Sequence, residues 1–312
     1  MPERNRGGVK VETDGIVGIL RQAGPLTGWE LLEQSGMEAL ALWRACRRAD
    51  GIRMECAGTR YLRLDRSVDG YARLSPSIRR EFLTYTVLGP EERSGEVAER
   101  ARRLRAEIAE ISRAKFELAR EAVAAVTDAL PLWEEIRERV CFIIAGDVTY
   151  GMAHAVPRPE ISTGRMVRGS DLDIIVVARD DVPAHALSAL DEAILRKKHY
   201  LLVHPNYQEE IDYLVKTLSR VREQLAFDSF SHMIASKILD EGEFLFGSDA
   251  LFGEVKGMVG ETGIPAKIAA LDDRAAESRR EAEARLLEPD AAPDGRADLG
   301  LFYTSEEGDE IY

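Results

Sequence analysis

The feature that most constrains the fold is an acidic pair at the entrance of an apolar run. Asp171 and Asp173 stand one residue apart, and the four residues 174–177 that follow are all β-branched. Such a run predicts a buried strand. Side chains two apart on a strand share a face, about 6.6 Å apart along its axis, so both carboxylates should point the same way. Two such carboxylates can share one or two Mg²⁺ ions with substrate phosphate oxygens. A core strand with merely solvated acids fits the same pattern.

A third carboxylate is predicted on a later strand. The stretch 211–215 is strand-like, and it places Asp212 among apolar residues. An unpaired acid in such surroundings would be costly. A metal shared with Asp171 and Asp173 would compensate that cost, whereas an acid on an edge strand would simply face water. Glu210 lies on the same strand face as Asp212 and is the reserve candidate.

Two glycine turns predict a site for phosphate. Gly169 and Ser170 allow a tight turn into the acidic strand, with backbone close to a phosphate. Upstream, an apolar strand at 140–145 is followed by Gly146 and Asp147, and such a turn can aim backbone N–H groups at a phosphate. Arg168 and Arg165 could neutralise charge there. The phosphate-binding candidates are therefore Gly146, Asp147, Arg168, Gly169 and Ser170.

Over residues 130–255 these motifs resemble those of the polymerase-beta-like nucleotidyltransferases. The stretch Gly-Ser-Asp-Leu-Asp-Ile at 169–174 resembles the acidic motif of that family, and Ile211–Leu214 resembles the strand with its third acid. The pattern from Leu239 to Gly247 is similar to a hook that follows its catalytic domain. Two departures stand out. Asp147 replaces the usual Ser after the first Gly, and an insertion at 153–167, predicted to be a loop from its prolines and glycine, lengthens the spacer.

The resemblance implies an α/β (α+β) core with a small mixed sheet and flanking helices. It also implies a two-metal enzyme that transfers a nucleoside monophosphate from an NTP to a hydroxyl acceptor that the motifs do not identify. Asp171, Asp173 and Asp212 would be both the catalytic residues and the ligands of Mg²⁺ or Mn²⁺, and Asp212 could also accept the acceptor's proton. The alternative is a non-catalytic, nucleotide-sensing DNA-binding regulator with a degenerate fold, an interpretation motivated by Asp147.

The first 75 residues resemble a winged helix-turn-helix domain. Helical spacing covers 14–23, 28–34 with a Thr27–Glu30 capping box, and 37–49, and residues 52–57 and 60–64 are predicted to form a β-hairpin. The third helix of such a domain enters the DNA major groove. Four arginines could therefore contact DNA or RNA, unless the domain contacts protein instead. They are Arg44, Arg47, Arg48 and Arg60.

Four regions are expected along the chain: the winged helix at 1–75, a helical linker at 76–130, the nucleotidyltransferase domain at 131–262, and a helix with an acidic tail at 263–312. The linker contains a long helix from 94 to 130 whose apolar stripe could pack on the catalytic domain or form a homodimer seam. Further helices are predicted at 183–196, 222–241 and 263–287. From Pro289 the composition predicts disorder, with an apolar end at 299–303 that could dock back.

Composition is compatible with a cytoplasmic protein. The 312 residues contain no apolar run close to the ~20 needed to span a membrane, and the first residues are not typical of a signal peptide. The three cysteines lack metal-site spacing and fit a reducing compartment. The net charge of −13 disfavours nucleic-acid binding by the whole surface, but the first 75 residues are slightly basic and leave it open there.

Overall fold

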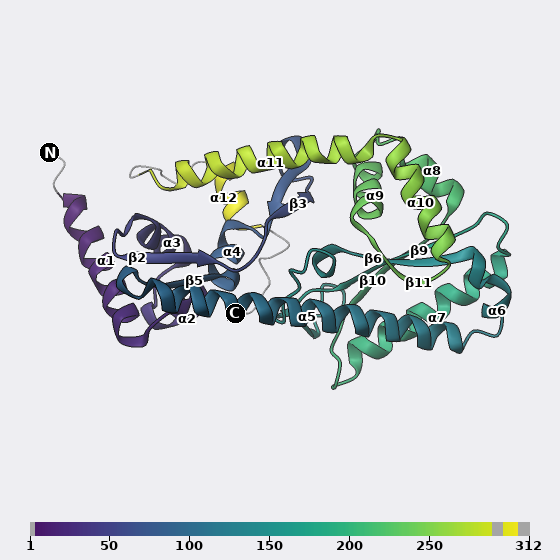
Figure 1. The fold of residues 1–312 in the computed structure, drawn as a ribbon, viewed down its shortest axis with the longest axis horizontal. Coiled ribbons are helices and arrows are strands. Elements are labelled where there is room, and N and C mark those ends of the chain that lie inside the picture. The colour runs from purple at the N-terminus through teal and green to yellow at the C-terminus, as the bar shows by residue number, and fades with distance from the viewer. Residues whose placement is uncertain (1–3, 289–295, 305–312) are drawn as a thin grey trace. The chain divides into compact units, whose positions relative to one another are not determined.

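The computed structural model describes residues 4–288 and 296–304, and the protein is a mixed α+β protein (Figure 1), as predicted. The chain forms two compact units. Of the described residues, those up to Glu107 and those from Asp272 to Thr304 belong to unit 1, and Ile108–Leu271 form unit 2. Helix α5 (Ser94–Asp128) and helix α11 (Ile264–Leu286) each begin in one unit and end in the other. The division therefore falls inside two helices rather than at the boundaries expected from the sequence.

Unit 2 is built on a four-stranded mixed sheet. Its strand order is β10 (Ile211–Thr217), β9 (Leu172–Ala178), β6 (Val140–Ala145), β11 (Glu243–Gly247). Strand β9 is parallel to β10 and antiparallel to β6, and β11 is antiparallel to β6. The small mixed sheet expected from the sequence is therefore present, and β11 lies within the segment 239–247 that was expected to form a hook.

Helices cover both faces of this sheet, which explains why β6 is apolar throughout and β9 is apolar except for Asp173. Phe142 and Ile174 face a core formed with the C-terminal half of α5 and with α7 (Ala184–Val203). Ile143 and Ile175 face the opposite core, under α8 (Leu218–Gln224), α9 (Phe230–Glu241) and α10 (Asp249–Glu261). Figure 1 shows α5 and α7 on one side of the sheet and α9 and α10 on the other.

Short elements complete unit 2. They are α6 (Trp133–Ile136), the 3-10 turns η3 (Arg137–Arg139) and η4 (Gly146–Val148), β7 (Pro157–Pro159) and β8 (Met166–Arg168). Strands β7 and β8 pair as an antiparallel hairpin, so the insertion predicted to be a loop contains regular structure.

The prediction of a single helix over residues 222–241 is wrong. It breaks into α8 and α9 because Phe227 takes a left-handed conformation (φ 57°) and Ser229 caps the second helix by accepting a hydrogen bond from the His232 N–H.

Unit 1 combines helices with two small sheets. Its elements are α1 (Arg4–Ala23), β1 (Leu26–Thr27), α2 (Gly28–Ser35), α3 (Ala39–Arg48), β2 (Ile52–Cys56), β3 (Tyr61–Leu64), η1 (Asp69–Tyr71), β4 (Ala72–Ser75), α4 (Ile78–Tyr85), β5 (Thr86–Pro90), η2 (Glu91–Arg93), the start of α5, the end of α11, and α12 (Arg296–Phe302). The three predicted helices are all present. The Thr27–Glu30 capping box is confirmed, with both of its hydrogen bonds formed.

The predicted hairpin of residues 52–57 with 60–64 is wrong. Strand β2 pairs with β5, and β3 pairs with β4, so the two segments belong to different sheets. Strand β5 carries Val87 and Leu88, both fully buried, and it lies about thirty residues beyond β2. Burial of this apolar strand in the middle of the β1–β5–β2 sheet outweighs the local turn at Gly58.

Part of the tail predicted to be disordered is ordered. Residues 296–302 form α12, and Phe302 is fully buried against Trp43 at a ring-centroid distance of 5.8 Å. The apolar end of the chain therefore docks on α3 within unit 1, whereas residues 289–295 lie outside the described part of the chain. Among the helices described, none combines the length and the apolar character needed to cross a membrane.

Candidate active site

Three carboxylates meet at one edge of the unit 2 sheet. Asp173 on β9 and Asp212 on β10 are direct neighbours across the parallel pair, and Asp171 immediately precedes β9. One carboxylate oxygen from each residue lies within 4.8 Å of those of the other two. The period-two argument placed Asp171 and Asp173 on one face, and the parallel pairing supplies the third acid. The structure thus brings together the three residues that the sequence singled out.

The surroundings of Asp212 differ from the expectation. Its side chain is 53% exposed, and Lys198 of α7 donates a hydrogen bond of 2.9 Å to its Oδ1. Of the two alternatives, the acid on an edge strand is the one that the structure shows, because β10 is the edge strand of the sheet and the Asp212 side chain reaches solvent instead of lying among apolar neighbours. The Lys198 ammonium therefore balances part of the Asp212 charge.

Gly146 closes the site beside Asp173. It follows Ala145, the register partner of Asp173, and has a φ of +72°. A Cβ built on Gly146 would lie 3.2 Å from Cγ of Asp173 and would overlap its Oδ2. Only glycine leaves the Asp173 carboxylate in its present position, so the first glycine of the motif supports the acidic cluster directly.

The Gly146 amide faces an internal carboxylate. Its N–H donates to Glu241 Oε1 at 3.4 Å, and the Tyr150 hydroxyl donates to Glu241 Oε2 at 2.6 Å. The Lys237 ammonium also donates to Glu241 Oε2. The side chains of Glu241 and Lys237 are both nearly buried. The turn expected to face phosphate therefore holds a glutamate from α9, a partner that the sequence did not indicate.

Asp147 and Ser170 form a buried link between the two glycine turns. Ser170 Oγ donates to Asp147 Oδ2 at 2.7 Å and accepts from the His154 N–H at 3.2 Å. Gly169 has a φ of +64°, and a Cβ there would overlap the His154 carbonyl. These residues hold the turns together, and their predicted contact with phosphate stays a prediction.

Arg158, which the sequence analysis did not select, lies at the site. It projects from β7, with Nη2 2.8 Å from Glu210 Oε2 and 3.9 Å from Asp171 Oδ2, and its Nε donates to the Gly169 carbonyl at 3.0 Å. Prolines on both sides of Arg158 indicate extended backbone, but no local signal shows which arginine of the insertion turns inward. Arg165 and Arg168, the two selected, have exposed side chains.

Glu210 is a buried acid held by this arginine. Burial raises the pKa of the Glu210 carboxyl, and the nearby charges of Asp171 and Asp212 raise it further, whereas Arg158 opposes both effects. The neighbouring Glu209 carboxylate is also buried, and it pairs with Lys115 of α5 at 2.5 Å. The reserve candidate Glu210 is thus close enough to Asp171 and Asp212 for their charges to affect it, and its own charge is paired with Arg158.

The C-terminal part of the apolar stripe of α5 packs in the core of unit 2. Ala119, Ala122, Val123 and Val126 are buried in the core shared with α7 and the sheet. Lys115, the polar interruption of the stripe, also donates to the Arg168 carbonyl at 2.8 Å. This segment therefore packs on its own domain, and the homodimer stays a prediction.

The four arginines predicted to bind nucleic acid all have partners from the C-terminal segment of unit 1. Arg44 Nε donates to the Leu286 carbonyl at 2.6 Å, and Arg48 donates to the Leu287 carbonyl. Arg47 and Arg60 lie 3.8 and 2.9 Å from the Glu283 carboxylate, and Arg60 also pairs with Glu81. Nucleic-acid contact through these residues stays a prediction, and it requires their displacement from α11.

Comparison with protein-family models, with curated proteins and with solved structures finds no match for this chain. The resemblance to polymerase-beta-like nucleotidyltransferases and to winged helix domains therefore stays a prediction, carried by the motifs and by the site geometry described above.

Proposed function

We propose that the chain is a metal-dependent nucleotidyltransferase that moves a nucleoside monophosphate from an NTP to a hydroxyl acceptor. One observation carries the proposal, namely the convergence of Asp171, Asp173 and Asp212 on adjoining parallel strands with ligand atoms within 4.8 Å. Three carboxylates so close together repel one another unless cations compensate them. Lys198 and Arg158 supply part of that compensation from the periphery.

The donor set fits a hard divalent cation. All three ligands are carboxylate oxygens, which Mg²⁺ and Mn²⁺ prefer, and the absence of a side chain on Gly146 leaves room for the Asp173 Oδ2 atom, which a Cβ would overlap. Asp171 and Asp173 would hold the ion that carries the nucleotide, and all three acids would hold the second. When bound, the ions supply charge neutralisation on the phosphates and lower the pKa of the acceptor hydroxyl.

The protein's own residues would orient the acceptor and take its proton. Asp212 is the most exposed of the three acids, so it can accept the acceptor's proton directly or through water. Lys198 holds the Asp212 carboxylate from α7 and acts as its positioning residue. Arg158 fixes the turn at Gly169 and keeps a positive charge near Asp171, where it would bind a phosphate oxygen.

The test is transfer of labelled α-phosphate. The purified chain is incubated with each α-labelled NTP, Mg²⁺ or Mn²⁺ and cell extract. Labelling of any acceptor should fall by about 10²-fold or more in Asp212→Asn, the scale of losing a positioned base. Asp191→Asn changes an exposed acid of α7 that does not belong to the three-carboxylate cluster, and it should leave labelling unchanged. Equal labelling by wild type and Asp212→Asn would refute the role of Asp212.

A non-catalytic, nucleotide-sensing regulator is the second candidate. It is favoured by the contact between Glu241 and the Gly146 amide, together with the buried Asp147, because both occupy the turn expected to face phosphate. A regulator would label nothing with any of the four NTPs, and nucleotide would instead change its affinity for DNA.

A further inference from the structure

The sheet of unit 2 has an open edge at β10. In the order β10–β9–β6–β11, β9 lies on one side of β10, and within the described residues no strand pairs with it on the other. The strand has seven residues, as many as β9 beside it. A long edge strand presents backbone N–H and C=O groups to which another strand can add, and natural edges are usually protected by exposed lysines or by prolines. The residue at the centre of β10 is instead Leu214, which is 58% exposed.

The pairing of β10 with β9 fixes which backbone groups face outward. The Leu172 N–H donates to the Glu210 carbonyl at 2.9 Å, so Glu210 and every second residue after it direct their backbone groups toward β9. The residues between them alternate with this set. The backbone groups of Ile211, Tyr213 and Val215 therefore face away from β9, on the open side of the strand.

The sequence of β10 is complementary to itself in an antiparallel register centred on Leu214. A second copy related by a two-fold axis then pairs all seven residues, and Tyr213 of one copy lies opposite Val215 of the other. Both of these residues have outward backbone groups, so a hydrogen-bonded ladder can form. In the same register Leu214 faces Leu214 of the partner subunit, and Asp212 faces Lys216 of the partner subunit. Opposite charges that face each other across such a ladder stabilise it, whereas a register centred on Asp212 or on Lys216 would oppose like charges.

Both charges of this pair can take a second partner. The Lys216 side chain is buried, its ammonium donates to Gln224 Oε1 at 3.0 Å, and no carboxylate pairs with it in the part of the chain that the structure describes. A desolvated cation without an anion is costly, and the flexible stem of lysine lets the ammonium turn toward the edge. On the other side of the pair, Lys198 donates to Oδ1 of Asp212 and leaves Oδ2 on an exposed side chain.

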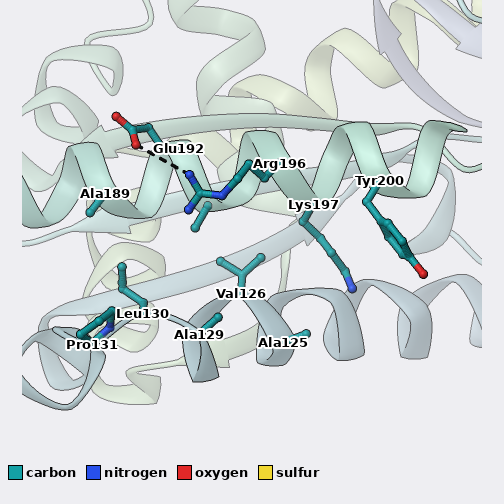
Figure 2. A pocket seen from close by; sticks show the side chains of 11 residues that line it. Ala125, Val126, Ala129, Leu130, Pro131, Ala189, Glu192, Arg196, Lys197 and Tyr200 are labelled. Atoms are coloured by element: carbon teal, nitrogen blue, oxygen red, sulfur yellow. Dashed lines mark ion pairs between the residues drawn. The ribbon is translucent and has the colours of Figure 1, made fainter. Parts of the chain in front are cut away.

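An exposed leucine of α7 adds apolar surface beside this edge. The Tyr213 hydroxyl donates to the Asp191 carbonyl of α7 at 3.3 Å, and Lys198 of α7 donates to a carboxylate of the same strand. Leu195 lies four residues after Asp191 and three before Lys198, so it shares their face of the helix, and it is 54% exposed. Figure 2 shows a different face of α7, where Tyr200 helps to line a groove beside α5, and Leu195 is not part of that groove.

We infer that β10 pairs with β10 of a second copy of this chain, antiparallel and centred on Leu214, so that the two sheets become one. The interface stands on the edge alone, whereas its effect on the acidic cluster rests on the proposed function. The partner strand covers Asp212, and Lys216 of the partner subunit takes the carboxylate that a metal would need. The dimer and the metal-loaded chain are therefore alternatives, and the dimer is the resting form.

Self-association is tested first, by sedimentation velocity of the full chain with EDTA present. Over a series from about 1 µM to 1 mM, the mean mass should rise from that of one chain, 34.7 kDa, toward that of two. Leu214→Lys places like charges opposite each other at the two-fold axis and should raise the dissociation constant about tenfold or more. Ile161→Lys is the matched control, because Ile161 is 92% exposed between β7 and β8. A monomer at every concentration, or a dimer that Leu214→Lys leaves intact, overturns the inference.

A cysteine on the two-fold axis tests the register. The facing residues at position 214 form a non-hydrogen-bonded pair, whose Cα atoms lie about 4.5 Å apart, within the ~4.4–6.8 Å that a disulfide spans. Leu214→Cys should therefore form a covalent dimer under mild oxidation, in a Cys56→Ser background that removes the exposed native thiol. Ile161→Cys in the same background should cross-link only at the rate of random collision. Equal cross-linking of the two variants, or a dimer that Leu214→Cys does not cross-link, places the contact elsewhere and overturns the inference.

Mn²⁺ separates the interface from the proposed function. Metal and partner strand compete for Asp212, so Mn²⁺ that binds the dilute, monomeric chain in isothermal titration should also dissociate the dimer in sedimentation. A dimer that persists although Mn²⁺ binds refutes its role as the resting form. If the chain dimerises in EDTA but the dilute chain binds no Mn²⁺, the interface stands and the proposed function fails. If the dilute chain binds Mn²⁺ but is monomeric at every concentration in EDTA, the metal site stands and the inference fails.

Discussion

Gly146→Ala should weaken metal binding at least tenfold at a small cost in stability. The φ of +72° costs an L-residue about 1–2 kcal/mol. The new methyl group would also overlap Oδ2 of Asp173, and the carboxylate must retreat by about 1 Å, far beyond the ~0.2 Å that a metal site tolerates. Because the carboxylate can rotate, the overlap adds little to the unfolding cost. Loss of one ligand should weaken Mn²⁺ binding at least tenfold, about 1.4 kcal/mol.

Gly151→Ala is the matched control for backbone strain. Gly151 follows in the same turn region, has a φ of +63°, and has no atom within 4 Å of a Cβ built on it. Both variants should lose about 1–2 kcal/mol in urea unfolding, since both replace a glycine at positive φ. Isothermal titration with Mn²⁺ should then show wild-type affinity for Gly151→Ala alone. Wild-type Mn²⁺ affinity in Gly146→Ala would refute the claim that Gly146 holds Asp173 in a metal site.

Three further predictions concern charge and capping. Arg158→Met leaves Glu210 buried without its cation and should destabilise the chain by about 3 kcal/mol in urea unfolding. The double variant Arg158→Met/Glu210→Gln should recover much of that stability, and no recovery would contradict the pairing. Burial lowers the pKa of Lys216 to about 8, so between pH 8 and 10.5 the unfolded chain binds the extra proton and stability rises with pH. Relative to Lys216→Met, the wild type should gain about 2 kcal/mol between pH 7 and 9.5, and a flat difference would exclude the shift. Thr27→Ala removes the α2 cap and should cost about 1 kcal/mol, while Thr262→Ala, at an exposed site, should cost less.

The acidic cluster could be predicted from sequence because its information is local. The period of two placed Asp171 and Asp173 on one face, and the strand pattern around Asp212 indicated a neighbouring strand. The apolar runs of β6 and β9 similarly indicated buried strands of a small sheet with helices on it. What the pattern could not show was that β10 is an edge strand, and therefore that Lys198 rather than apolar side chains surrounds Asp212.

The rest depended on partners distant in the chain. Strand β2 pairs with β5 across about thirty residues, and no feature near Gly58 shows that pairing. Arg44 and Arg48 meet carbonyls near the end of α11, about 240 residues away, so their helical face looked free in the sequence. Arg158 turns toward Glu210 whereas Arg165 and Arg168 are exposed, and this difference arises in the β7–β8 hairpin, which no local sequence pattern showed.

The most direct test of the central claim is anomalous diffraction from crystals of the full chain grown with Mn²⁺ and a non-hydrolysable NTP analogue. The account predicts anomalous density within bonding distance of the carboxylates of Asp171, Asp173 and Asp212, with the phosphates of the analogue on the same ions. Lys198 should then have moved away from at least one oxygen of Asp212. Absence of anomalous density at the three carboxylates, with Lys198 and Arg158 still paired to them and the analogue elsewhere, would contradict the assignment of a metal centre.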